Sequence, residues 1–86
     1  VYTETAAVAS RLDLRGKRYD EALAAAERYI DQAFRSGAPS VTVVTGHGTG
    51  ALKKGLKELL STPPYVREHR PERSNADGAT VIEFDR

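Results

Sequence analysis

The chain has 86 residues, of which 40% are hydrophobic and 29% charged, and a formal net charge of +1 at pH 7, as is typical of one globular domain with a small core. It contains no cysteine, which excludes disulfides and thiolate chemistry, and its two histidines alone cannot form a structural zinc site. The near-neutral charge does not by itself indicate a nucleic-acid-binding protein, and no apolar run reaches the roughly 20 residues of a membrane span.

The start of the chain shows no clear hydrophobic period. Residues 1–10 are therefore expected to be a linker or lead-in, and residues 11–86 a single domain. The sequence has no methionine, which indicates either a removed initiator or a domain cut from a longer protein, and we expect the second. No secretory signal is visible, which predicts a cytoplasmic location without a membrane partner.

A strand and a helix are predicted next along the chain. Apolar and charged residues alternate over Arg11–Gly16, which favours a strand. Over Tyr19–Ser36, apolar residues recur at three- and four-residue steps, which indicates an amphipathic helix. Asp20 is its expected N-cap, and Gly37 stands where a helix C-terminus commonly needs a glycine.

The second half of the chain predicts three strands, a helix and a loop. Val41–Thr45 is β-branched throughout, as a buried strand would be. Ala51–Leu60 repeats leucine at helical spacing and is predicted to be a helix. Tyr65–Arg70 and Ala79–Phe84 are predicted strands, and residues 71–78 a loop rich in turn-forming residues.

The resulting order, β-α-β-α-β-β, predicts an α/β fold. We expect a two-layer sandwich in which two helices cover one face of a four-stranded mixed sheet. The first two strands should be parallel, because a right-handed crossover through the first helix joins them. The other face of the sheet is expected to stay open.

Asp13 and Arg15 are the first candidate site residues. Side chains two apart share one face of a strand, and Leu12 and Leu14 are expected to point to the helices. Asp13 and Arg15 would then lie on the open face, where the planar guanidinium could bind a phosphate. The alternative is a solvated ion pair of little energetic value.

The second candidate is the segment Thr45–Gly50, TGHGTG, between a predicted strand and a helix. Its glycines allow the backbone to approach a ligand closely, and the helix N-terminus favours an anion. His47 could move protons or donate to a phosphoryl oxygen; the alternative is a glycine-rich turn with an incidental histidine. The segment lacks the Lys-Ser/Thr pair of a P-loop, and its G-x-G-x-x-A match to a dinucleotide fingerprint is weak.

These two motifs are expected to meet in space. Both lie at the carboxyl ends of strands joined by one parallel crossover, and ligands of open α/β sheets gather at that edge. An acid, an arginine, a histidine and a glycine-rich turn would then converge on one site.

Basic residues accumulate after the glycine-rich segment. Residues 51–73 contain six Lys or Arg against three Glu, which fits a polyanion bound beside the turn. The alternative is an ordinary polar helix face. The residues predicted to bind phosphate or nucleic acid are Gly46, Gly48, Thr49, Gly50, Lys53, Lys54, Lys57, Arg67 and Arg70.

Three motifs together resemble the Smr (small MutS-related) domain: LDLRG at residues 12–16, TGHGTG at residues 45–50 and GATVI at residues 78–82. The resemblance covers about residues 10–86. Arginine rather than histidine at Arg15 is the form usual in the C-terminal domain of bacterial MutS-II proteins. The family often has a run of glycines before the last strand, where this chain has Asn75-Ala76-Asp77-Gly78.

The resemblance implies a fold similar to the C-terminal domain of translation initiation factor three. It also implies an endonuclease that nicks DNA with little sequence preference, while RNA cleavage or ribosome association is found in other members. The parent protein would act in recombination suppression and DNA repair, or in ribosome rescue. By position, Asp13, Arg15 and His47 would carry catalysis, and Gly46, Gly48 and Gly50 would shape the site.

A phosphodiester-hydrolysing nuclease is the first hypothesis, with His47 as general acid or base and Arg15 stabilising charge on the phosphate. Only Asp13 is well placed to hold a divalent cation such as Mg²⁺ or Mn²⁺, so we expect one metal ion or none. The alternative is a non-catalytic module that binds nucleic acid or the ribosome. A dimerisation module is disfavoured, because Asp13 and Arg15 place charge on the open face.

Overall fold

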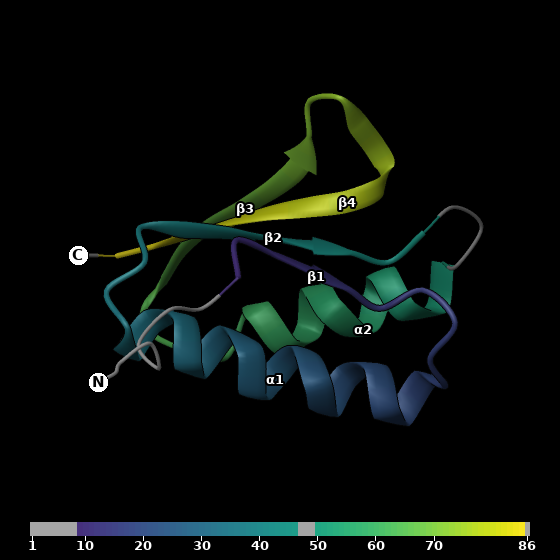
Figure 1. Ribbon diagram of the computed structural model, residues 1–86, viewed down its shortest axis with the longest axis horizontal. Helices are drawn as coiled ribbons and strands as arrows, with labels where there is room; N and C mark the ends of the chain where they lie inside the picture. The colour runs from purple at the N-terminus through teal and green to yellow at the C-terminus, as the bar shows by residue number, and fades with distance from the viewer. Residues whose placement is uncertain (1–8, 47–49, 86) are drawn as a thin grey trace.

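The computed structural model describes residues 9–46 and 50–85, and for residues 75–77 the backbone alone. A four-stranded sheet in the order β1-β2-β4-β3 is covered on one face by two helices (Figure 1). This confirms the predicted two-layer α/β architecture. The elements are β1 Arg11–Asp13, α1 Tyr19–Arg35, β2 Ser40–Val44, α2 Gly50–Leu60, β3 Val66–Glu72 and β4 Asn75–Phe84.

The sheet is mixed, as expected. β1 and β2 are parallel, with Leu12 opposite Val43, and β4 lies antiparallel between β2 and β3. The predicted lead-in lies mostly outside the described residues, but its last two residues already contact the domain. The hydroxyl of Tyr29 donates to the carbonyl of Ala9, and the N–H of Thr42 donates to the carbonyl of Ser10 at 2.9 Å.

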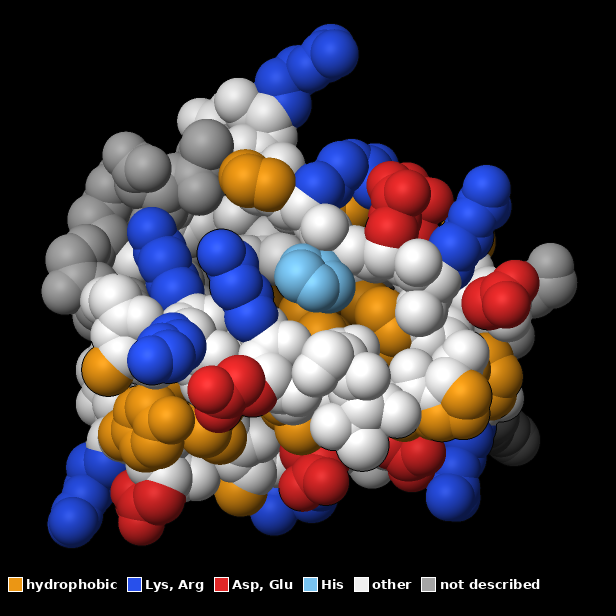
Figure 2. Space-filling model, turned by 180° about the vertical axis from the view of Figure 1, so that it is seen from behind, with side chains coloured by type: hydrophobic (Ala, Val, Ile, Leu, Met, Phe, Trp, Pro, Cys, Tyr) orange, Lys and Arg blue, Asp and Glu red, His pale blue; other side chains and the backbone are white. Residues whose placement is uncertain are grey.

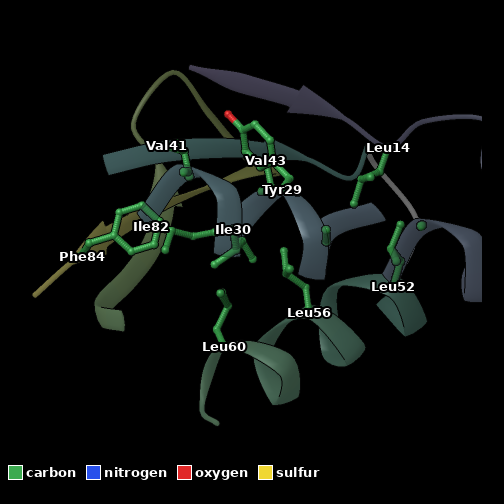
Figure 3. Packing of buried hydrophobic residues seen from close by; sticks show 13 residues of the cluster. Leu14, Tyr29, Ile30, Val41, Val43, Leu52, Leu56, Leu60, Ile82 and Phe84 are labelled. Atoms are coloured by element: carbon green, nitrogen blue, oxygen red, sulfur yellow. The ribbon is translucent and has the colours of Figure 1, made fainter. Parts of the chain in front are cut away.

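The core fills the space between the sheet and the two helices (Figure 3). Val43 reaches it from β2, and Leu14 from just after β1. Ile30 reaches it from α1, and Leu52 and Leu56 from α2. These are the positions at which the alternating pattern of the strands and the 3.6-residue period of the helices place apolar side chains. Within the described residues, no helix is long and apolar enough to cross a membrane.

The two ends of α1 differ in how well they were predicted. The expected N-cap Asp20 is wrong: Arg18, in extended conformation, precedes the helix, and the carboxylate of Glu21 accepts its N–H at 3.4 Å. A glutamate at the third helical position stabilises this earlier start. The expected C-terminal Gly37 is confirmed, with φ +91° and the N–H of Ala38 donating to the carbonyl of Ala33 at 3.1 Å.

The predicted loop 71–78 is wrong. β3 continues to Glu72 and β4 begins at Asn75, so that these residues extend a hairpin instead. Pro71 is tolerated because β3 is an edge strand, where a missing N–H breaks no pairing on the solvent side. The far end of this hairpin rises above the sheet on the side away from the helices (Figure 1).

The face away from the helices is only partly open. Neighbouring residues on a strand point to opposite faces, so Val44 faces away from the core that contains Val43. Val44 and its cross-strand partner Ala79 are nevertheless buried. Arg11 of β1 and Glu72 of the hairpin form an ion pair of 2.6 Å, which ties the hairpin to the opposite edge of the sheet.

Candidate functional site

Three segments meet where β1 and β2 end. The N–H of Leu14 donates to the carbonyl of Val44 at 2.7 Å, which keeps the two strands together just past β1. The N–H groups of Thr45 and Gly46 both donate to the carbonyl of Gly78, at 2.8 and 3.0 Å. The start of the glycine-rich segment is therefore fixed from both sides, by β1 and by β4.

β1 is shorter than predicted, and its end orients the first candidate pair. The strand stops at Asp13, whose carboxylate accepts the backbone N–H of Arg15 at 2.9 Å. Such a local bond competes with strand pairing and turns the chain. Gly16 follows with φ +84°. As expected, Leu14 enters the core and Asp13 and Arg15 are exposed.

Asp13 and Arg15 form a two-pronged ion pair. Nε and Nη2 of Arg15 lie 3.0 and 2.7 Å from Oδ1 and Oδ2 of Asp13. These side-chain bonds, with the backbone N–H bond from Arg15, lower the pKa of Asp13 to about 2, and the same side-chain bond raises the pKa of Arg15. The side chains are 49% and 65% exposed, so the pair adds little stability and serves to orient the guanidinium.

Gly46 lies against the side chain of Arg15. Its φ is +86°, which side-chain-bearing residues rarely adopt. A Cβ at this position would also lie 3.1 Å from Cγ and 3.5 Å from Cδ of Arg15. The stem of the arginine therefore lies directly against the backbone of the turn, which brings the two sequence motifs together.

A helix N-terminus points at the same end of the molecule. α2 begins at Gly50 and has no acidic residue in its first turn. Both helices begin at the end of the sheet where β1 and β2 finish (Figure 1). Unpaired N–H groups and the positive end of the helix dipole favour an anion there. His47, Gly48 and Thr49 lie outside the described residues, so their site roles stay predictions.

Three of the predicted basic residues, Lys53, Lys57 and Arg70, line one groove between α2 and the β3–β4 hairpin. Lys54 and Arg67 are exposed. Arg70 lies 2.9 Å from a carboxylate oxygen of Glu68 and 2.5 Å from one of Glu83, and these acids raise its pKa. Its positive charge is therefore already compensated within the sheet.

A divalent cation at Asp13 stays a prediction. Among the described residues, no three His, Cys, Asp or Glu side chains gather closely enough to hold a metal ion by themselves. Both carboxylate oxygens of Asp13 already accept hydrogen bonds from Arg15. The groups that this part of the site offers to a ligand are the remaining N–H groups of Arg15 and the N-terminus of α2, which favour an anion.

Sequence reasoning missed two features of this region. The carbonyl of Gly78 anchors the turn, and no local signal identifies a backbone acceptor from a distant strand. His69 lies in the groove with Lys53 and Lys57. His69 and Arg70 are neighbours on the predicted strand, so their side chains point to opposite faces of the sheet. This alternation could have placed His69 on the face that the helices cover.

Comparisons with known proteins agree with this geometry. The Smr domain family model matches residues 12–85. The chain is 48% identical over 83 residues to Endonuclease MutS2 of Enterococcus faecalis, covering 94% of this chain and 10% of that protein. Against Endonuclease MutS2 of Listeria welshimeri it is 38% identical over 86 residues, covering 98% and 11%. The chain thus spans about a tenth of the length of these relatives.

Solved structures show the same fold. The Smr domain of Thermus thermophilus MutS2 superposes with a TM-score of 0.78 at 27% identity, covering 88% of this chain and 98% of that one. YdaL, a stand-alone small MutS-related protein from Escherichia coli, gives a TM-score of 0.82 at 16% identity, covering 90% and 65%. The chain belongs to the Smr domain family. Within that family it is a nuclease-related domain similar to the small Smr part of MutS2 proteins.

Proposed function

We propose that this domain is an endonuclease that nicks or cleaves DNA by phosphodiester hydrolysis with little sequence preference, with RNA as a second substrate. One observation carries the proposal: at the end of the sheet where α2 begins, Asp13 orients the guanidinium of Arg15, whose stem lies against Gly46. Proteins similar to this chain bear the name Endonuclease MutS2, which supports the same activity. The domain would act within a larger MutS-like protein, in recombination suppression and DNA repair or in ribosome rescue.

Arg15 is the group that would bind the scissile phosphate. Asp13 occupies Nε and one N–H of Nη2, so the remaining N–H groups stay available to phosphate oxygens. Negative charge builds up on those oxygens as a nucleophile adds to phosphorus. A guanidinium already fixed in position stabilises that charge without reorganising during the reaction.

His47 is the group that would move the proton. Asp13, with a pKa of about 2, is ionised at neutral pH and is a weak base there. Hydrolysis forms a bond from water oxygen to phosphorus and breaks the bond from phosphorus to the leaving oxygen. A proton leaves the water and one reaches the leaving oxygen. An imidazole side chain can both accept and donate a proton near neutral pH, so a histidine next to Gly46 suits either transfer.

A second candidate function is a non-catalytic module that binds nucleic acid or the ribosome. The observation that favours it is the anion-binding character of the site: the carboxylate of Asp13 is engaged by Arg15, which leaves the guanidinium and the N-terminus of α2 to bind an anion. In that case Arg15 and His47 would only contact phosphates.

Nicking of supercoiled plasmid separates the two functions. Wild type is compared with His47→Ala and Arg15→Ala, with Mg²⁺, Mn²⁺ or EDTA, and a structured RNA is tested in parallel. Arg28→Ala, a charge loss on an exposed position of α1, is the control. Loss of nicking in both site variants but not in the control supports the nuclease. Binding without any nicking by folded wild type supports the non-catalytic module.

A further inference from the structure

A basic groove runs between α2 and the β3–β4 hairpin. Its volume is about 350 Å³. Figure 2 shows a face on which a histidine lies at the edge of a hollow that contains apolar side chains. Lys or Arg side chains gather beside this histidine. The lining residues used below are Lys53, Leu56, Lys57, His69, Pro71 and Thr80.

The two lysines of this groove have no counter-charge. Lys53 and Lys57 are one helical turn apart on α2, and half-buried His69 faces them from β3. Among the described residues, none of these three side chains has a hydrogen-bond or ion-pair partner. By contrast, Arg11 and Arg70 are both paired with carboxylates. Basic side chains converging without a counter-charge indicate a site for an anion.

The groove runs along α2, whose N-terminus lies at the candidate active site. Lys53 and Lys57 are three and seven residues beyond Gly50, where α2 begins. At 1.5 Å per residue, they lie about 5 and 10 Å along the helix axis from its N-terminus. Successive phosphates of one DNA strand advance by about 3.4 Å along the duplex axis. A strand that runs along α2 from a phosphate bound at its N-terminus would therefore reach Lys53 and Lys57 about one to three nucleotides later.

We propose that this groove is a second phosphate-binding site, which holds the backbone of the nucleic acid next to the phosphodiester that is cut. The ammonium groups of Lys53 and Lys57 bind phosphate oxygens, protonated His69 donates a further hydrogen bond, and the exposed ring of Pro71 contacts the sugar. This inference rests on the proposed function, since it assumes that the ligand is a nucleic acid. It adds His69 to the residues that bind it.

Binding at this site should strengthen as pH falls. The charged or titratable groups around His69 are Lys53 and Lys57 from α2 and Arg70 from β3, while β4 contributes the uncharged Thr80. No carboxylate among the described residues lines the groove. Histidines gain a proton between pH 8 and 5, and a bound phosphate favours the protonated form.

The first test measures affinity for a fluorescent 20-base-pair DNA duplex by anisotropy, between 50 and 200 mM salt. We compare wild type with the double variant Lys53→Gln/Lys57→Gln and with the charge-matched control Arg28→Gln/Arg35→Gln on α1. Circular dichroism melting verifies folding of each. Loss of two phosphate contacts should weaken binding about tenfold or more and reduce the slope of log K against log salt by about 2. Binding and slope equal to those of the control would overturn the proposal.

The second test isolates His69. The affinity of wild type should be higher at pH 6 than at pH 8, and His69→Gln should lose at least half of that difference. In wild type, the imidazole NMR signals of His69 should shift on addition of the duplex. Unmoved signals, or a pH dependence that His69→Gln retains in full, would overturn the assignment.

Failure of the groove and failure of the nuclease give different results. If wild type binds the duplex through the groove but does not nick plasmid, the proposed function is wrong and the groove stands. If wild type nicks plasmid while the groove variant binds as the control does, the nuclease stands and the groove is wrong.

Discussion

Replacement of Gly46 by alanine tests the link between the turn and Arg15. Gly46 has φ +86°, and a Cβ there would lie 3.1 Å from Cγ of Arg15. Gly37 has a similar φ of +91°, but a Cβ there would have no atom within 4 Å. Gly37→Ala is therefore a matched control, because it introduces the same backbone strain without touching the site.

The expected loss of stability is similar for both variants. An alanine in the left-handed region costs about 1–2 kcal/mol. The reduced freedom of the unfolded chain offsets about 0.4–1 kcal/mol of this. A net loss of about 1 kcal/mol lowers the melting temperature of a domain this size by roughly 4–8 °C.

The expected effect on activity differs between the variants. In Gly46→Ala the stem of Arg15 must move by a few tenths of an ångström, which disturbs its two bonds to Asp13. Since displacements of 1 Å can cost on the order of a hundredfold in rate, we expect on the order of a tenfold loss of nicking.

Both variants are assayed for nicking of supercoiled plasmid at 25 °C, with equal folded fractions verified by circular dichroism. Wild-type nicking by Gly46→Ala would refute the argument that Arg15 needs the glycine beneath it. An equal loss in Gly37→Ala would show that general instability, and not the position of Arg15, lowers the activity.

Three further predictions concern the ion pairs and the core. Because the pKa of Asp13 is lowered to about 2, its ion pair with Arg15 should persist as pH falls from 8 to 4 and break only near pH 2. Asp13→Asn should therefore reduce nicking equally across that range. A change in the shape of the pH–rate profile would contradict this. Leu56 is 1% exposed, so Leu56→Ala should lower the free energy of unfolding by about 2–5 kcal/mol in urea titration; a loss below 1 kcal/mol would show that the core refills the space. Arg11→Gln should change stability little, because exposed ion pairs contribute little, but should speed hydrogen exchange in the hairpin beyond Glu72; unchanged exchange would show that the pair does not hold the hairpin.

The order of elements could be predicted from the sequence because the signals are local. The hydrophobic period of the sequence predicted helices over Tyr19–Ser36 and Ala51–Leu60. The bounds of α1 and α2 differ from these ranges by one residue each. Gly37 marks the helix end through a φ that glycine adopts easily. Such signals need no knowledge of distant partners.

The hairpin could not be predicted in the same way. Residues 71–78 contain Pro, Asn, Asp and Gly, which taken alone indicate a loop. Their pairing depends on β3 lying at the edge of the sheet and on irregular register between β3 and β4. Both are properties of the assembled sheet and leave no local pattern.

The parts of the candidate site that depend only on strand topology could be predicted from the sequence. Parallel strands bring Asp13 and Arg15 to the same edge as Gly46, as expected from their motifs. The compensation of Arg70 by Glu83 depends on strand register, and so does the placement of His69 opposite α2. The role of His47 stays a prediction.

The central place of β4 sets the order in which this domain can be completed during synthesis. β4 lies between β2 and β3 in the sheet, so these two strands cannot join one sheet until residues 75–84 have been synthesised. Pairings such as Val41 with Ile82 close long loops, which slows folding. Gly78 of the same strand anchors the turn after β2. A chain interrupted before β4 therefore lacks both the finished sheet and the anchored turn, so the site forms only with the last strand.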